Sequence, residues 1–281
     1  MQRTLANWGA NVAVTCLADS DALQESLRRD LRRVGIDDQR LSARRMDLCS
    51  PESVAEFAAW YEDRHGRELH VLVNNAGIHR DLLGRHSEPI RSADGFEIHW
   101  RTNYLGTFQL TSLLLPMLVE GGRRSGDARI VNVVSHLHDR GSNAGFFDEP
   151  RDYNSWQAYG QSKLALVHFS RELQRRFGEK GNLKSVALHP GSSSTNMTFR
   201  GLREYPVLWR VVCMFAPLES LVLLSPAQGA QTSIMCASTA LLEGGGYYER
   251  CAIAGASEDA GDAMVAKRLW ETTQDWVASL V

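Results

Sequence analysis

The pentapeptide Tyr159-Gly160-Gln161-Ser162-Lys163 places a phenol and an ammonium group four residues apart. In a helix over residues 156–176, both side chains lie on one face, one turn apart. A neighbouring cation favours the ionised form of a phenol, whose pKa is ordinarily about 10. The pair therefore suits proton transfer to or from a carbonyl or alcohol oxygen. On its own the spacing is weak evidence, because tyrosine and lysine meet at this distance by chance on many surface helices.

Further motifs accompany this pair in a fixed order along the chain. Apolar segments at 69–73, 130–134 and 186–188 have the character of short buried strands, and each ends in polar or turn-forming residues. The motifs are Asn74-Asn75-Ala76-Gly77 after the first segment, Asn103 in a predicted helix, Ser135 after the second segment, and His189-Pro190-Gly191 after the third.

Taken in this order, the motifs resemble those of the short-chain dehydrogenase/reductase family, and the resemblance covers nearly the whole chain. The resemblance implies an α/β fold: a Rossmann-like, doubly wound parallel sheet. It also implies hydride transfer between NAD(P)(H) and an alcohol, aldehyde or ketone. The segments closest to the retinol-dehydrogenase-like branch of the family are 156–165, 225–230, 246–251 and 267–270.

The alternation of apolar patterns independently predicts βαβ units and a parallel sheet. Ser50 and Pro51 suit the N-cap and first position of a helix, and Gly121, Gly122 and Gly126 indicate a turn. We find no repeat or linker, so residues 1–281 are expected to form one domain. Strands are predicted at about 11–16, 41–46, 69–74, 129–134, 184–189 and 247–253, and helices near 20–34, 51–64, 93–119, 156–177, 226–239 and 262–279.

The amino-terminal segment departs from the family pattern. Residues 1–8 resemble the end of the family's first helix and residues 9–16 its second strand, so the first strand and the glycine-rich turn are absent from the sequence. In a 3-2-1-4-5-6 sheet the first strand lies at the centre, and the turn anchors the cofactor's pyrophosphate. We expect unpaired backbone on the two flanking strands. The sequence is either a truncated version of a working enzyme, which the intact catalytic positions favour, or a natural variant that has lost cofactor binding.

Four residues are candidates for catalysis. Tyr159 would act as general acid in reduction and as general base in oxidation, and Ser135 would donate a hydrogen bond to the substrate oxygen. The resemblance implies that Lys163 lowers the pKa of Tyr159 and binds the nicotinamide ribose, and that Asn103 holds a water near the lysine. A strand-end serine is usually a turn residue and a mid-helix asparagine a packing residue. All four in order favour catalysis.

Other positions resemble cofactor-binding residues. Asp47 and Leu48 would contact the adenine, and Asn75, Ala76 and Gly77 would flank the adenine ribose. Pro190, Gly191 and Thr195 would lie against the nicotinamide amide, beside Tyr159 and Lys163. The end of the second strand, which separates NAD from NADP, carries Cys16 and Leu17 instead of an acidic residue or an arginine. We favour NADP slightly over NAD.

Composition narrows the function classes. The net charge of −2 gives no attraction to nucleic acid, and five scattered cysteines favour reduced thiols in a cytoplasmic protein. His136 and His138 lack a third ligand at metal spacing, so no metal site is expected. Charged residues interrupt the apolar stretch 207–224, so a lid over an apolar small-molecule substrate at 206–225 is favoured over a membrane span.

Two matters stay open at the level of the sequence. The family resemblance implies a homodimer or homotetramer formed through the helices near Asn103 and Tyr159. The alternative to an enzyme is a non-catalytic interaction or regulatory protein of the same fold, which the missing glycine-rich turn supports.

Overall fold

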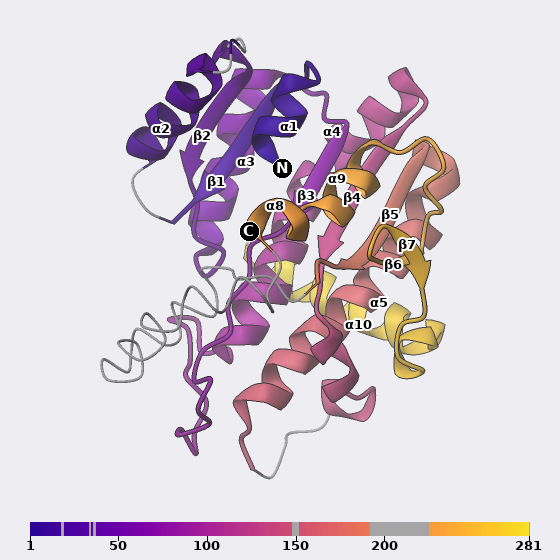
Figure 1. Cartoon of the computed structure of the whole chain (residues 1–281). Helices are drawn as coiled ribbons and strands as arrows, with labels where there is room; N and C mark the ends of the chain where they lie inside the picture. The colour runs from indigo at the N-terminus through magenta and orange to yellow at the C-terminus, as the bar shows by residue number, and fades with distance from the viewer. Residues whose placement is uncertain (18–19, 34, 36–37, 148–151, 192–224, 281) are drawn as a thin grey trace.

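The computed structural model describes residues 1–17, 20–33, 35, 38–147, 152–191 and 225–280. Within these residues, strands form a two-stranded and a five-stranded sheet, with helices packed against them (Figure 1). Thr195 and positions 206–224 of the expected lid lie outside the described residues. Of the helices in the described part of the chain, none combines the length and the apolar character that crossing a bilayer requires.

The smaller sheet is built from the amino-terminal part of the chain. Strands β1 (Val12–Cys16) and β2 (Leu41–Arg45) pair in parallel, and α2 (Ser20–Arg33) connects them. The short helix α1 (Gln2–Asn7) precedes β1. Buried Ala6, Leu31 and Leu41 form a small apolar cluster that joins α1, α2 and β2.

The larger sheet contains β3 (Val71–Asn74), β4 (Ala128–Val133), β5 (Leu183–His189), β6 (Tyr247–Glu249) and β7 (Ala252–Ala254), in that order. The first four strands are parallel, and β7 runs antiparallel to β6. The prediction of one strand over 247–253 is therefore wrong. Arg250 and Cys251 have φ angles of 49° and 62°, a left-handed conformation that reverses the chain and splits the segment into a hairpin.

The two sheets are divided where the family places its first strand. Among the described residues, β1 pairs only with β2, and β3 pairs only with β4. The expectation of unpaired backbone on the two flanking strands is thereby confirmed. Within the described part of the chain, β1 and β3 therefore each carry amide and carbonyl groups without a ladder partner on one side.

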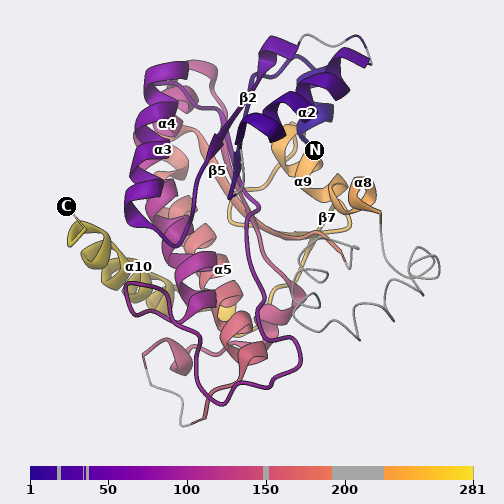
Figure 2. The ribbon, with the colours of Figure 1, turned by 90° about the vertical axis from the view of Figure 1, so that its left-hand side faces the viewer.

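Helices cover both faces of the sheets, as expected for a doubly wound fold. Figure 2 shows α3 (Pro51–His65), α4 (Gly106–Ser125) and α5 (Ser155–Gly181) on one face, with α2, α8 (Pro226–Gly229) and α9 (Gln231–Ser238) on the other. Helix α10 (Ala263–Ala278) packs against α5. Short 3₁₀ helices span Asp38–Arg40, His136–Arg140, Ala144–Phe146 and Asp259–Gly261.

Helix ends follow local chemistry, with one exception. Helix α3 begins as predicted, because the Ser50 hydroxyl accepts a hydrogen bond from the Ser53 amide at 3.1 Å. The predicted helix 93–119 is wrong at both ends: a π-helical segment begins at Trp100 and leads into α4, which continues to Ser125. Gly126, with a φ angle of 80°, then ends the helix.

The prediction of a turn at Gly121 and Gly122 is also wrong, since both lie inside α4. A Cβ atom at Gly121 would collide with the Leu69 carbonyl, and one at Gly122 with the Gly181 carbonyl. These glycines therefore serve close helix packing rather than a change of chain direction.

Candidate active site

The predicted cofactor residues follow the carboxyl ends of parallel strands. Asp47 and Leu48 come after β2, Gly77 after β3, and Pro190 and Gly191 after β5. In open α/β sheets this edge carries the ligand site. The larger sheet thus places Gly77, Pro190 and Gly191 along its carboxyl edge, with Ser135 after β4 among them, while Asp47 and Leu48 follow a strand of the smaller sheet.

Tyr159 lies inside this edge, on α5. Tyr159 is 2% exposed, and Ser135 is the neighbouring side chain that acts on its phenol. Burial raises the pKa of Tyr159 to about 12, and the hydrogen bond with Ser135 opposes that rise. Ser135 also caps the following 3₁₀ helix, since its Oγ accepts from the Leu137 amide at 3.3 Å. The structure therefore brings the phenol and the strand-end hydroxyl together.

Lys163 lies one helical turn further along α5 and is also buried. Its Nζ donates to the Val133 carbonyl at 3.1 Å and lies 5.7 Å from the centre of the Tyr159 ring. Burial lowers the pKa of Lys163 to about 8. The pKa of Tyr159 is therefore higher than usual and not lower as expected, because burial of the phenol dominates its environment.

Asn103 connects the loop after β3 to α5. Its Oδ1 accepts from the Ile78 amide at 2.8 Å, and its Nδ2 donates to the Ile78 carbonyl and the Ser162 hydroxyl, both at 3.0 Å. Ser162 in turn donates to the Tyr159 carbonyl at 2.7 Å. The π-helical segment Trp100–Leu105 turns this side chain inward, where it is fully buried. Whether Asn103 also holds a water stays a prediction.

Gly77, in the loop after β3, lies close to two of the catalytic candidates. A Cβ atom at this position would lie 3.1 Å from Lys163 Nζ and 3.2 Å from Asn103 Oδ1. A larger residue would therefore press on both side chains. The preceding Asn75 and Ala76 are exposed at the edge of the sheet.

The predicted adenine contacts lie beside the π-helical segment. The Asp47 carboxylate accepts from the Cys49 amide at 2.8 Å, which fixes the turn after β2. The buried Leu48 receives a hydrogen bond at its carbonyl from Arg101 Nη1, at 2.7 Å. Arg101 thereby ties the turn after β2 to the segment that carries Asn103.

Sequence reasoning missed His79, which packs directly on Tyr159. The imidazole stacks on the Tyr159 ring with centroids 4.4 Å apart and planes 13° apart, and it meets the edge of Trp156 at 4.5 Å. It is 6% exposed, and burial lowers its pKa to about 4, so the ring is neutral at pH 7. His79 lies two residues after Gly77, a predicted cofactor-binding residue, and this proximity in sequence could have indicated it.

Two substitutions of His79 should show whether the site needs its stacked ring or a nitrogen atom of its imidazole. We expect His79→Ala to lower kcat, because the Tyr159 ring loses the surface that fixes its orientation. His79→Phe keeps a stacked ring and should retain most of the activity. Steady-state kinetics of both variants test this. A matching loss in the phenylalanine variant would show that an imidazole nitrogen is required.

The prediction that neither His136 nor His138 has a third metal ligand nearby is wrong for His136. His138 is buried, with its Nδ1 against the Ser135 carbonyl at 2.7 Å and its Nε2 accepting from the Ser257 amide at 3.0 Å. His136 instead meets His189 and Glu249, whose ligand atoms lie within 4.8 Å of one another. No sequence motif indicates this cluster, because its members come from three different strand ends.

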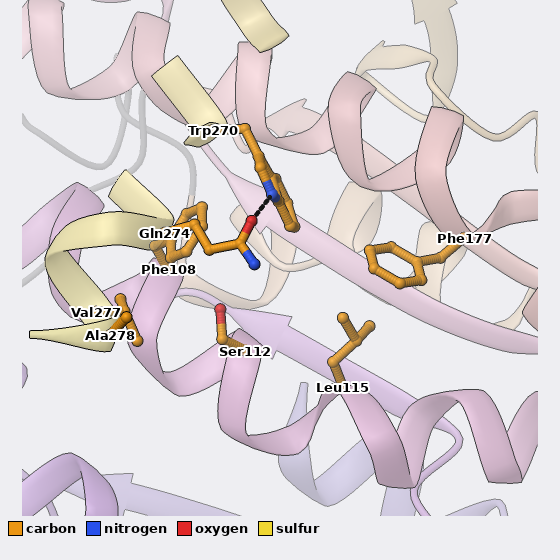
Figure 3. A pocket seen from close by; sticks show the side chains of 8 residues that line it. All are labelled: Phe108, Ser112, Leu115, Phe177, Trp270, Gln274, Val277 and Ala278. Atoms are coloured by element: carbon orange, nitrogen blue, oxygen red, sulfur yellow. Dashed lines mark hydrogen bonds between the residues drawn. The ribbon is translucent and has the colours of Figure 1, made fainter. Parts of the chain in front are cut away.

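A cavity of about 330 Å³ lies elsewhere, between α4, α5 and α10 (Figure 3). Phe108, Leu115, Phe177 and Trp270 line it, and Trp270 Nε1 donates to Gln274 Oε1 at 2.9 Å. None of the candidate catalytic residues lines this cavity.

A doubly wound α/β sheet with a buried tyrosine, a buried lysine and a partly exposed serine at its carboxyl edge is typical of nucleotide-dependent dehydrogenases. Residues 1–204 match the family described as short chain dehydrogenase. The chain belongs to the short-chain dehydrogenase/reductase family and resembles its retinol dehydrogenases. It is therefore an NAD(P)-dependent oxidoreductase that acts on small molecules.

Curated relatives and solved structures agree with this assignment. Retinol dehydrogenase 11 of Homo sapiens is 34% identical over 97% of this chain and 80% of its own length. Retinol dehydrogenase 12 of Mus musculus is 35% identical over 96% and 79%. A crystal structure from Mycobacterium paratuberculosis is 30% identical, with a TM-score of 0.69 over 98% of this chain and 87% of its own. The carbonyl reductase Sniffer of D. melanogaster, 22% identical with a TM-score of 0.55 over 85% and 84%, supports the fold alone.

Proposed function

We propose that the protein interconverts an apolar alcohol and its aldehyde or ketone, with Tyr159 as the general acid and base and NADP(H) as the preferred cofactor. The observation that carries this proposal is the buried Tyr159 phenol beside Ser135, with the buried Lys163 on the same helix. The retinol dehydrogenases among its relatives support an apolar alcohol as substrate. The role of residues 206–225 as a lid stays a prediction.

A bound nicotinamide cofactor would supply the hydride for reduction of the carbonyl carbon and accept it in oxidation of the alcohol. In reduction the carbonyl oxygen must gain a proton. Tyr159 is protonated at neutral pH, and burial raises its pKa further, to about 12, so it could give that proton. The Ser135 hydroxyl would donate a hydrogen bond to the same oxygen. In oxidation the Tyr159 phenolate would take the proton of the alcohol.

The residues present fit the nicotinamide end of the cofactor. Gly77 leaves space beside Lys163 and Asn103, and Gly191 has a φ angle of 85°, which allows the backbone to turn closely after β5. Lys163 would reach the ribose, and Pro190 and Gly191 the nicotinamide amide. The glycine-rich turn that holds the pyrophosphate in the family is not in this sequence.

Arg45 supports the preference for NADP. It lies opposite Cys16 in the paired strands, and its Nε donates to the Leu17 carbonyl at 3.1 Å. Its guanidinium therefore lies at the end of β1, where an arginine receives the 2′-phosphate in dinucleotide-binding folds. Sequence reasoning examined only the end of that strand and missed the arginine on its neighbour.

Replacement of Arg45 should change cofactor choice. Arg45→Ala should weaken NADPH binding by about tenfold or more, because a charge-assisted phosphate contact is worth about 1.5–3 kcal/mol. NADH binding should hardly change. Arg44→Ala is a matched control, since successive side chains of a strand point to opposite faces. Titrations that show equal losses for both cofactors would contradict the assignment.

The alternative is a non-catalytic interaction protein, which the division of the strands into two sheets among the described residues favours. Thermal denaturation with NADPH and NADH separates the two functions. A cofactor present at about 100 times its dissociation constant should add about 2.7 kcal/mol to the free energy of unfolding. Stabilisation by NADPH supports the enzyme. No stabilisation by either cofactor at millimolar concentration would favour the interaction protein.

A further inference from the structure

Two histidines and a glutamate meet at the carboxyl ends of three adjacent strands. His136 follows β4 in the chain, His189 is the last residue of β5, and Glu249 is the last residue of β6. We propose that His136, His189 and Glu249 form a binding site for a zinc ion. The proposal does not depend on the oxidoreductase activity.

The distances fit a zinc ion after a small adjustment. The ligand atoms of the three side chains lie within 4.8 Å of one another, and His136 Nε2 is 3.1 Å from Glu249 Oε1. In tetrahedral coordination with bonds of about 2.0–2.2 Å, neighbouring ligand atoms are about 3.3–3.5 Å apart. One edge of the site thus already has nearly the required length, and the others need only a modest closure.

The backbone holds the three positions in place. His189 and Glu249 are directly paired in the parallel ladder between β5 and β6. The Val134 amide donates to the Leu188 carbonyl at 2.8 Å, which fixes the chain just before His136. The site therefore requires side-chain rotation rather than rearrangement of the sheet.

Of the three proposed ligands, His189 is the one whose buried side chain is not fully hydrogen-bonded without a metal ion. Its side chain is 7% exposed, and its Nδ1 has no hydrogen-bond partner among the described residues. Its ring lies against that of His136, with centroids 3.9 Å apart. A buried polar atom without a partner costs free energy, and a metal ion would satisfy it.

The donor set favours zinc over magnesium or calcium. Two imidazoles and one carboxylate are the ligands of many zinc sites that keep a fourth position open, whereas magnesium and calcium prefer oxygen donors. His136 is about half exposed, so an ion can enter from solvent. Arg250 Nε lies 3.6 Å from Glu249 Oε1, but its side chain is 89% exposed and can move away.

A second histidine–glutamate pair in the chain offers a matched control. His70 Nε2 lies 3.2 Å from Glu68 Oε1, and the two side chains are 50% and 37% exposed. This pair resembles His136 and Glu249 in distance and exposure. Among the described residues it belongs to no group of three metal-binding side chains.

The test is zinc uptake by the full chain after dialysis against a chelator, followed by competition with a chromophoric chelator. We expect one zinc ion per chain, and cobalt in its place should give the absorption bands of a tetrahedral site. His136→Ala and Glu249→Gln should each weaken binding by more than about tenfold, since even outer partners of metal ligands contribute about 10- to 100-fold. His70→Ala should bind as the parent does.

Thermal denaturation without metal checks that each variant is folded. Zinc should raise the midpoint of the parent and of His70→Ala but not of His136→Ala. Absence of zinc uptake by the parent, or equal uptake by the parent and His136→Ala, would overturn the proposal. Either result would mean that His136 and Glu249 form only an ion pair, with the His189 imidazole packed against His136.

Discussion

Tyr159→Phe should reduce turnover by about 100- to 10,000-fold, the usual contribution of a general acid or base. Phenylalanine keeps the ring that stacks on His79, so the surrounding packing is retained. The substitution removes only the hydroxyl that bonds Ser135. Cofactor affinity should therefore be nearly unchanged. The measurement is steady-state reduction of retinal and long-chain aldehydes with NADPH, alongside a cofactor titration.

The pH dependence gives a second readout of the same substitution. Burial raises the pKa of Tyr159 to about 12, so the phenolate that oxidation requires becomes more abundant as the pH rises toward that value. The rate of alcohol oxidation should rise with pH in the parent, and this rise should vanish in Tyr159→Phe. Tyr104→Phe is the matched control, because Tyr104 is also buried and bonds Thr273 at 2.9 Å. Unchanged turnover in Tyr159→Phe would refute the catalytic assignment.

Lys163→Met should lower both turnover and cofactor affinity without destabilising the fold. The ammonium group is buried, and its pKa of about 8 is below the ordinary 10.5, so the folded state disfavours the charged form. Below pH 8 the parent therefore carries a penalty that methionine lacks, offset in part by the lost bond to Val133. The variant should unfold at a similar or higher temperature at pH 7.

The control for this substitution lies on the same helix. Lys180→Met replaces an exposed lysine near the end of α5 and should leave kinetics unchanged. Loss of turnover in Lys163→Met with intact cofactor affinity would contradict the proposed ribose contact. A large fall in the unfolding temperature would instead show that the lysine supports the structure.

Local patterns were sufficient for most of the fold. β5 spans 183–189 where 184–189 was predicted, and α3 begins at the Ser50 cap, because an apolar run and a capping residue act on their immediate neighbours. The hairpin at Arg250 and Cys251 was missed because left-handed conformations at non-glycine residues leave little trace in sequence. The helical segment that begins at Trp100 starts later than predicted, where the Trp100 amide donates to the Glu97 carboxylate at 2.8 Å.

The candidate site was predictable only in part. The order of the motifs predicted that Ser135 and Tyr159 belong to one site. The structure places the two residues next to each other. The raised pKa of Tyr159 could not be anticipated, because it depends on burial by residues distant in sequence. The same holds for His79 and for the cluster around His189, whose members meet only when separate strands align.

The division of the sheet also affects how the molecule is held together. Among the described residues no strand ladder joins β1 and β2 to the larger sheet. Packing of the buried Met46 and Leu48 against Leu110 and Leu114 of α4 links the two parts instead. The proposed adenine contacts follow the smaller sheet and the proposed nicotinamide contacts follow the larger one. A dinucleotide bound by both would therefore add a second connection to this apolar packing.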